Sequence, residues 1–334
     1  MGCACARKHR GRRRRRADSA RHGFVRSRRL TPQYEPDCRV AVPFYPALFF
    51  LAALWGGSFL FMRVAAPVLG PVWLIEVRVL IAGLVLLPLL AHRRQLSALR
   101  GHWRLLMWVG CLNAALPFTL LAYSSVYLTA GMTSILNATV PIFAALIGFL
   151  VYAEPLDRAR GLGVVLGFLG VVVLVGTPHD GGVLPLLPIA TGLAAAVSYV
   201  FAANFAKRRL MQVPALVFVT GSQLGAAVAL LPLLPFFPPP QLPNMTVVSA
   251  VFALAVLSTS LAFLIYFQLI REVGPARTLS VTYLIPVFAI LWGALLLGET
   301  LTLSMLLGGV LILLGVALAN HRGFAGLWGR PPSR

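Results

Sequence analysis

Acidic residues are scarce in this chain, which has nine Asp and Glu among 334 residues and only 11% charged residues in all. No Asp lies in any long apolar run, and the six histidines all lie between such runs or near the chain ends. The four cysteines, Cys3, Cys5, Cys38 and Cys111, have no spacing that suits a metal ion. Catalysis within a membrane needs His, Asp or a metal cluster in one place, so we expect neither an enzyme nor a metal or other cofactor.

Apolar residues are abundant: they make up 59% of the chain, and the mean hydropathy is +0.85. A soluble domain of this length could not bury that much apolar surface, so much of it must face lipid. About twenty apolar residues cross a bilayer core. That length predicts ten spans, near 46–66, 72–91, 104–122, 130–151, 161–176, 184–206, 214–232, 246–268, 276–297 and 302–320. The predicted fold class is an all-α polytopic membrane protein with ten transmembrane helices.

The formal net charge of +20 is unevenly placed. Thirteen Lys and Arg against three acids lie in residues 1–39, and most other basic residues lie in alternate loops between the apolar runs. The remaining loops contain no Lys or Arg, and only Arg63 and Arg78 lie away from the basic set. Because cytoplasmic loops carry the basic residues, both termini are predicted to be cytoplasmic.

One passage occurs twice. Residues Thr133–Val171 and Thr278–Val316 align without gaps 145 positions apart, and Pro141, Glu154 and Gly163 match Pro286, Glu299 and Gly308. Five spans in each half is an odd number, so the second copy should enter the membrane upside down. We therefore predict a 5+5 inverted repeat, an arrangement from which many carriers are built.

The sequence resembles the EamA-like branch of the drug/metabolite transporter superfamily over roughly residues 46–320. The motifs that carry the resemblance are Ala53–Phe59 (ALWGGSF), Arg78, Asn113–Phe118 (NAALPF), Asn137–Pro141 with Glu154, Ser280–Glu299, and Gly308–Gly315. The resemblance implies a first repeat at 46–176, a second at 184–320, an Arg-rich cytoplasmic leader at 1–45 and a cytoplasmic tail at 321–334. It also implies an inner-membrane secondary transporter that moves a small metabolite, amino-acid-like or another small organic compound, by alternating access, with efflux as the expected direction.

Substrate contact needs polar or aromatic side chains that face a central cavity, because polar groups facing lipid are costly. The mid-span residues predicted to bind substrate are Trp55, Ser58, Asn113, Phe118, Asn137, Tyr199, Ser258 and Tyr283. Purely structural roles stay open for each, since a buried Ser often bonds its own helix and an Asn often bridges two helices.

Three charged residues, Glu76, Arg78 and Arg63, lie near spans with no loop position to explain them. One interpretation is a gating or coupling group, in which Glu76 either pairs with Arg63 or Arg78 as an outer gate or is a protonatable carboxylate that drives exchange. The alternative is interfacial residues that reach the outer headgroups. Glu154 and Glu299 are predicted to cap the helices that follow them, and the glycines from Gly161 to Gly170 are predicted to pack helices in lipid.

Other interpretations remain open at this level. The leader is either a disordered cytoplasmic tail or a product of a misassigned start, and it lacks the aromatic interleaving typical of nucleic-acid binding, so no nucleic acid is expected as a partner. The expected partners are the small-molecule substrate and the lipid bilayer, and a homodimer is an open alternative to a monomer. A passive channel is the main rival function, and a membrane-embedded enzyme is a weaker one.

The charge distribution predicts which loops face the cytoplasm. In a cysteine-free background, Asp180→Cys should react with a membrane-impermeant thiol reagent on intact cells, whereas Arg208→Cys should not. The reason is that the 177–182 loop lacks Lys and Arg, while Lys207, Arg208 and Arg209 form a basic loop. Labelling at 208 but not at 180 would contradict the inverted-repeat topology.

Overall fold

The protein is described from a computed structural model, over residues 43–175 and 186–320, and those ranges are helical with no β-strand. Residues 1–42 of the predicted leader, the tail and the 177–182 loop lie outside the described residues. The predicted end of the leader at 45 was wrong, because Phe44 and Tyr45 already belong to the first helix. The α-helices of the first half are α1 (Phe44–Leu69), α2 (Pro71–His92), α3 (Leu96–Gly101), α4 (Trp103–Gly110), α5 (Leu116–Tyr127), α6 (Ala130–Asn137), α7 (Val140–Tyr152) and α8 (Arg158–Val175). Those of the second half are α9 (Leu186–Arg209), α10 (Ala215–Leu230), α11 (Met245–Ala255), α12 (Ala262–Val273), α13 (Pro275–Thr278), α14 (Val281–Leu297) and α15 (Leu303–Ala319).

Three further segments complete the described helices. Two are π-helical, η1 (Cys111–Ala115) between α4 and α5 and η4 (Val256–Leu261) between α11 and α12. The third is a 3₁₀ turn, η3 (Leu231–Phe236), which follows α10. Each π-helical segment continues the helices on either side of it, so α4–η1–α5 and α11–η4–α12 each run as one long helical unit.

The apolar helices confirm the predicted fold class, an all-α polytopic membrane protein. Eight helical segments of the described residues are long and apolar enough to cross a membrane, and α14 and α15 are shorter apolar helices of 17 residues each. A 17-residue helix rises about 26 Å, slightly less than the roughly 30 Å of a bilayer core. The count of ten spans therefore stays a prediction.

The segment before α14 has a matched partner in the first half. α13 and α14 are separated only by Leu279 and Ser280, while α6 and α7 are separated only by Ala138 and Thr139. The two broken segments run from 130 to 152 and from 275 to 297, the same 145-residue offset as the sequence repeat. Pro141 lies in the first turn of α7, directly after its break, where its missing N–H interrupts helical hydrogen bonding. The matched Pro286 lies inside α14, six residues after Ser280, so the two breaks are not at the same position of the repeat.

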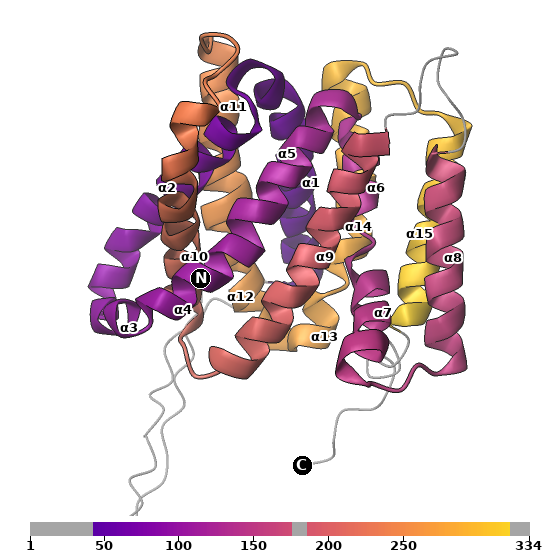
Figure 1. Cartoon of the computed structure of the whole chain (residues 1–334), viewed down its shortest axis with the longest axis horizontal. Coiled ribbons are helices and arrows are strands. Elements are labelled where there is room, and N and C mark those ends of the chain that lie inside the picture. Colours follow the sequence, from indigo (N-terminus) through magenta and orange to yellow (C-terminus); the bar gives the residue numbers. More distant parts are fainter. Residues whose placement is uncertain (1–42, 176–185, 321–334) are drawn as a thin grey trace, which may run out of the picture. The chain divides into compact units, whose positions relative to one another are not determined.

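The connections that follow these broken segments also match. Ala153 and Gly298, again 145 residues apart, both adopt the left-handed conformation, with φ of 54° and 64°. The N–H groups of Glu154 and Glu299 then donate to the carbonyls of Gly148 and Gly293, at 2.9 and 3.1 Å. This pattern is a left-handed helix cap that satisfies terminal carbonyls. In Figure 1 the α7–α8 connection lies at the bottom of the helices and the α14–α15 connection at the top.

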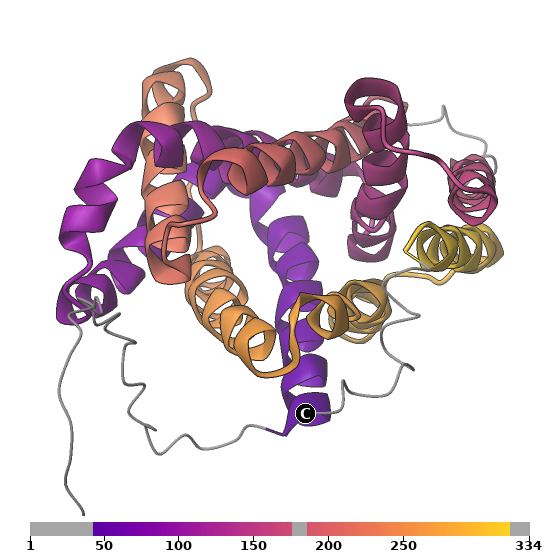
Figure 2. The same cartoon turned by 90° about the horizontal axis from the view of Figure 1, so that it is seen from below.

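α8 and α15 pack along each other, as Figures 1 and 2 both show. Their glycines allow backbone contact: a Cβ on Gly163 would lie 2.6 Å from the Gly315 carbonyl oxygen, and one on Gly170 would lie 2.9 Å from that of Gly308. The N-terminal part of α8 therefore contacts the C-terminal part of α15, and the C-terminal part of α8 contacts the N-terminal part of α15. The two helices are antiparallel. Gly163 and Gly170 correspond to Gly308 and Gly315 in the repeat, so the contact is reciprocal. The predicted packing role is confirmed for Gly163 and Gly170, whereas Gly161 makes no close contact with another helix.

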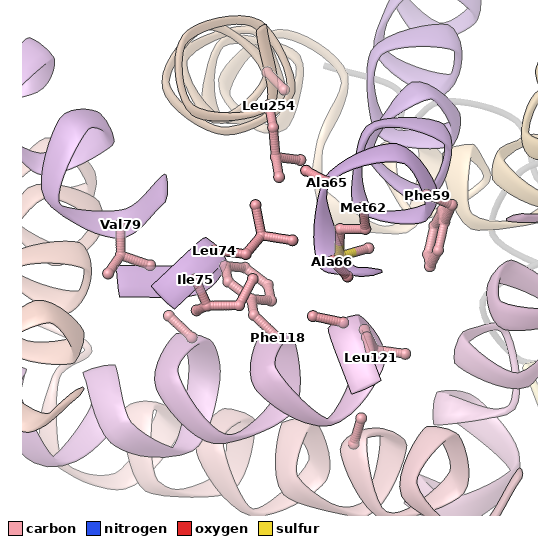
Figure 3. Close-up of a cluster of buried hydrophobic side chains, with 14 of the residues drawn as sticks. Phe59, Met62, Ala65, Ala66, Leu74, Ile75, Val79, Phe118, Leu121 and Leu254 are labelled. Atoms are coloured by element: carbon pink, nitrogen blue, oxygen red, sulfur yellow. The ribbon is translucent and has the colours of Figure 1, made fainter. Parts of the chain in front are cut away.

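The main core joins α1, α2 and α5. Figure 3 shows Met62 and Ala66 of α1, Leu74 and Ile75 of α2, and Phe118 of α5 gathered between their helices. All five side chains are buried. A second cluster of buried apolar residues surrounds Leu136, Ile142 and Ile312, and it links α6, α7 and α15. The first core therefore holds the helices that carry most of the predicted site residues.

The glycine contact predicts a stability difference between two neighbouring substitutions on α8. Gly163→Ala should lower the free energy of unfolding by about 1–3 kcal/mol, because its Cβ would overlap the backbone of α15. Gly161→Ala is the matched control: its Cβ would meet only Leu156, at 3.9 Å, so higher helix propensity should leave stability equal or up to about 1 kcal/mol greater. Unfolding in detergent measures both, and equal effects would show that the α8–α15 contact is looser than described.

Candidate functional site

The two π-helical segments mark the centre of the candidate site. η1 begins at Cys111 and η4 at Val256, 145 residues apart, so the same distortion occurs in both halves. A π-helical turn shifts the backbone hydrogen bonds, and such turns frequently occur at functional sites. Side chains bond carbonyls at both turns: the Ser198 hydroxyl donates to Leu112 at 2.8 Å, and the Thr259 and Ser260 hydroxyls donate to Leu254 and Ala255 at 2.8 and 3.0 Å.

Arg78 belongs to α2, which packs against both segments, and it is almost fully buried, at 4% exposure of the residue. Its Nε donates to the Thr259 hydroxyl oxygen at 3.0 Å, and one terminal nitrogen lies 3.8 Å from the Met62 sulfur. The guanidinium carbon is 3.8 Å from the centroid of the Phe118 ring, a cation–π contact. Every one of these partners is neutral. The guanidinium thus carries its charge without a carboxylate beside it.

Aromatic side chains extend the site on two sides. The Phe118 ring meets the edge of Tyr199 with centroids 6.3 Å apart, so α5 and α9 share one aromatic pair. Trp55 of α1 contacts Tyr266 and Phe263 of α12, with ring centroids 5.2 and 6.0 Å apart. Trp55, Phe118, Tyr199 and Tyr266 all belong to, or pack against, the same core cluster as Met62.

The glycine after Trp55 sets how closely α14 approaches α1. A Cβ on Gly56 would lie 2.7 Å from Phe288 Cβ and 2.9 Å from the Ala289 nitrogen. The neighbouring Gly57 has no such contact, its nearest atom being 3.7 Å away. The Trp-Gly-Gly motif therefore combines an aromatic contact with close packing between the two halves.

The predicted substrate residues have different surroundings. Phe118 contacts Tyr199, and Trp55 packs against the same first core. Ser258 lies in η4 beside Thr259 with a buried hydroxyl that has no hydrogen-bond partner among the described residues. Ser58 donates to the carbonyl of Trp55 in its own helix, at 2.7 Å. Tyr283 packs instead against the second cluster, where its hydroxyl donates to Val316 at 3.3 Å.

The two asparagines have different surroundings. Asn113 is half-buried within η1, so it sits on the distorted turn near Ser198. Asn137 ends α6, and within the described chain its buried Oδ1 lacks a hydrogen-bond partner. Substrate contact stays a prediction for both residues, as it does for the other six.

The predicted pairing of Glu76 with an arginine does not form. Glu76 is buried at 4% exposure, and its Oε2 has no hydrogen-bond partner in residues 43–175 and 186–320. Arg63 pairs with Glu299 instead, at 3.7 Å between Nε and Oε1. Glu76 and Arg78 are two residues apart on one helix, so they point to different sides, which explains why they do not meet.

Arg63 and Glu299 tie several helix ends together. One terminal nitrogen of Arg63 donates to the carbonyls of Ser125 and Val126 near the end of α5, at 3.0 and 2.6 Å. Both Glu299 carboxylate oxygens accept from the Ala130 N–H at the start of α6, at 3.0 and 3.1 Å. A carboxylate at a helix N-terminus is favourable with the helix dipole. The sequence predicted that Glu299 caps the helix after it, and that was wrong: Thr302 caps α15, and Glu299 caps α6.

The matched position in the first half differs. Glu154 is exposed, and within the described residues its carboxylate forms no hydrogen bond or ion pair. The residue that corresponds to Ala130 is Pro275, which has no N–H to donate. Nearby, Arg208 lies over the Tyr152 ring at 4.7 Å from its centroid. The two ends of the repeat are therefore held by different contacts.

Two residues at the centre were missed from sequence. Met62 and Phe263 were not among the predicted site residues, although Met62 contacts Arg78 and Phe263 contacts Trp55. These residues reach the site because of the π-helical turn and of which helices pack together, and the hydrophobic periodicity of the sequence predicts neither. No group of three His, Cys, Asp or Glu that could hold a metal ion occurs in the described part of the chain. The expectation that no metal or cofactor is used stays a prediction.

Comparison with known proteins identifies the family. Residues 44–176 and 186–321 each match the profile of the EamA-like transporter family. The chain belongs to this family. The two matched ranges coincide with the two halves defined by the repeated helices, so each half is one copy of the family's unit.

Curated relatives of similar length agree with this assignment. The chain is 27% identical to the "Uncharacterized transporter YvbV" of Bacillus subtilis strain 168, over 82% of this chain and 90% of the relative. It is 29% identical to the "Uncharacterized inner membrane transporter YedA" of Escherichia coli K12, over 79% and 86%. A third relative, at 27% identity over 82% and 93%, is named "Probable amino-acid metabolite efflux pump" in Salmonella typhimurium LT2.

A solved structure, titled "Crystal structure of protein", shares the fold. Its TM-score is 0.59 at 22% identity, covering 84% of this chain and 98% of the other. Taken with the apolar helices, the family and relatives show that this EamA-like protein is a membrane transporter, multi-pass and of the inner membrane. The relatives' names also suggest that it is not an enzyme.

The Arg63–Glu299 contact predicts unequal effects at matched positions. Glu299→Ala should lower the free energy of unfolding by about 1–3 kcal/mol, because it leaves the Ala130 N–H without its acceptor and Arg63 without its carboxylate partner. Glu154→Ala, the matched control in the other half, should change stability by less than about 0.5 kcal/mol because its carboxylate is exposed. Unfolding of the two purified variants in detergent measures this, and equal losses would contradict the asymmetry.

Proposed function

We propose that this EamA-like transporter is a secondary carrier that moves a small organic compound by alternating access between two inverted five-helix halves. The observation that carries the proposal is the antiparallel, reciprocal contact of α8 with α15. These helices are repeat counterparts, so their opposite directions support an inverted arrangement of the halves. Inverted repeats let one half rock against the other about a fixed central site.

The unequal ends of the repeat support the alternating-access part. At one end Arg63, Glu299 and the Ala130 N–H connect α1, α5, α6 and the end of α14. At the matched end Glu154 is exposed and makes no such connection within the described residues. A carrier needs one end closed while the other is free to open. The Arg63–Glu299 group is therefore proposed as the closed gate of the state described here, which gives Arg63 the gating role expected from sequence.

The proposed substrate site lies between the two π-helical segments. Trp55, Phe118 and Tyr199 supply aromatic surface, and Asn113 and Ser258 supply polar groups from the matched distorted turns. Asn137, at the end of α6, and Tyr283, in the first turn of α14, are proposed to reach the site when the halves move. Efflux is the proposed direction, because one relative is named as an efflux pump for amino-acid metabolites.

A passive channel is the second candidate for the same architecture. The two are separated by counterflow in proteoliposomes, in which unlabelled substrate on one side speeds uptake of labelled substrate from the other. A carrier shows this acceleration because unlabelled substrate bound on the far side brings the site back to face the labelled substrate. A channel has no such reorientation step and shows no acceleration. The substrate is first found by export assays of an overexpressing strain against a metabolite panel.

Single substitutions then test the site. Asn113→Ala and Asn137→Ala should each weaken the apparent affinity in counterflow by about 1–2 kcal/mol, the scale of one lost hydrogen bond, at normal protein abundance. Asn204→Ala is the control, because the Asn204 amide donates to Val200 of its own helix at 2.9 Å. If the double variant Asn113→Ala, Asn137→Ala transports substrate as well as the wild type, neither side chain binds substrate, and both only form contacts between helices.

A further inference from the structure

Arg78 is the one basic residue that is buried within the described residues, and the described chain gives it no counter-charge. The other buried acid–base candidate, Glu76, lies on the same helix but makes no ion pair with it. A charge buried in a membrane protein without a partner is costly, so such residues are rare and usually face a ligand or ion path. The surroundings of Arg78 therefore call for a functional explanation.

The contacts of the guanidinium leave donors unused. It has five N–H groups, of which Nε bonds Thr259 and one terminal nitrogen faces the weak acceptor Met62 sulfur. The Thr259 hydroxyl already donates to Leu254, which orients its oxygen as the acceptor toward Arg78. The Phe118 ring covers the plane of the guanidinium. Nε and the plane are thus held in place, while the terminal nitrogens have no oxygen acceptor among residues 43–175 and 186–320.

A held guanidinium with free terminal nitrogens matches the planar, two-oxygen geometry of a carboxylate. We propose that Arg78 binds the carboxylate of the transported compound, so that the substrates are small organic monocarboxylates with an apolar body. This rests on the proposed carrier function. The aromatic residues Trp55, Phe118 and Tyr199 in the same core suit the apolar body, and the unpartnered hydroxyl of Ser258 adds a donor beside Thr259.

The charge count favours a carboxylate over a phosphate monoester. A phosphate monoester carries nearly two negative charges at neutral pH, and Arg78 is the single cation at this centre in the described chain. One guanidinium balances one carboxylate. Glu76 does not face Arg78, so it does not compete for the guanidinium in this state.

Binding to the purified full-length protein in detergent tests the proposal with matched probes. The probes are 3-phenylpropionate and hexanoate, their neutral amides 3-phenylpropionamide and hexanamide, the cation phenethylamine, and phenyl phosphate. We expect at least one carboxylate to raise the thermal midpoint in a concentration-dependent way, and its amide and the other probes to give at least tenfold weaker effects. Equal shifts from a carboxylate and its amide, a stronger shift from phenethylamine or phenyl phosphate, or no shift from either carboxylate would overturn the proposal.

Variants assign the effect to Arg78. Arg78→Gln should abolish the carboxylate shift. Arg78→Lys should keep part of it, because the charge remains but the planar pair of donors is lost. Arg93→Gln, at the exposed residue directly after α2, should keep all of it. A full shift in Arg78→Gln would overturn the proposal.

A second measurement needs no ligand. If Arg78 serves substrate binding and not stability, Arg78→Met should have a thermal midpoint equal to or above that of the unliganded wild type. The reason is that the substitution removes a buried charge that has no counter-charge and replaces it with an apolar side chain. A midpoint clearly below wild type would assign Arg78 to structure. Counterflow separates the two proposals: carboxylate binding without accelerated exchange would contradict the carrier, and accelerated exchange of neutral or cationic compounds alone would contradict the carboxylate site.

Discussion

The need to satisfy polar groups without water governs this structure. In hydrocarbon a backbone N–H or C=O without a partner costs several kcal/mol, so each helix break must be bonded from within. At the two π-helical segments the hydroxyls of Ser198, Thr259 and Ser260 bond backbone carbonyls. At the ends of α7 and α14 the left-handed residues Ala153 and Gly298 bring the next N–H groups back to the carbonyls of Gly148 and Gly293. The irregular backbone is thereby confined to positions where function can use it.

The two halves share a plan but not every contact. The π-helical turns, the broken segments and the left-handed caps recur at a constant offset of 145 residues. The contacts that join one half to the other differ, because Ala130 offers Glu299 an N–H that Pro275 could not offer Glu154. A duplicated chain with identical contacts at both ends would have two states of equal free energy. Substitutions such as this one set which state is favoured.

The centre of the molecule combines a fixed charge with aromatic surface. Arg78 is held by Thr259 from the second half and by Phe118 and Met62 from the first. Relative movement of the halves would therefore change the surroundings of this guanidinium. A site shared between two moving halves is how a carrier couples substrate binding to conformational change.

The sequence by itself determined the class of protein, the helix positions and the repeat. Apolar length and turn residues gave spans such as 72–91 against the observed Pro71–His92, because lipid imposes one length scale on every helix. It also singled out Trp55, Phe118, Tyr199 and Arg78, since aromatic and charged residues are conspicuous within apolar runs. Only the tertiary structure decided their partners. One interpretation of the sequence paired Glu76 with an arginine, but Glu299, 236 residues further along the chain, pairs with Arg63. The rotation of each helix about its axis, and the helices that it packs against, depend on many small contacts such as that between Gly163 and Gly315. These contacts join residues far apart in the chain, so no local sequence pattern predicts them.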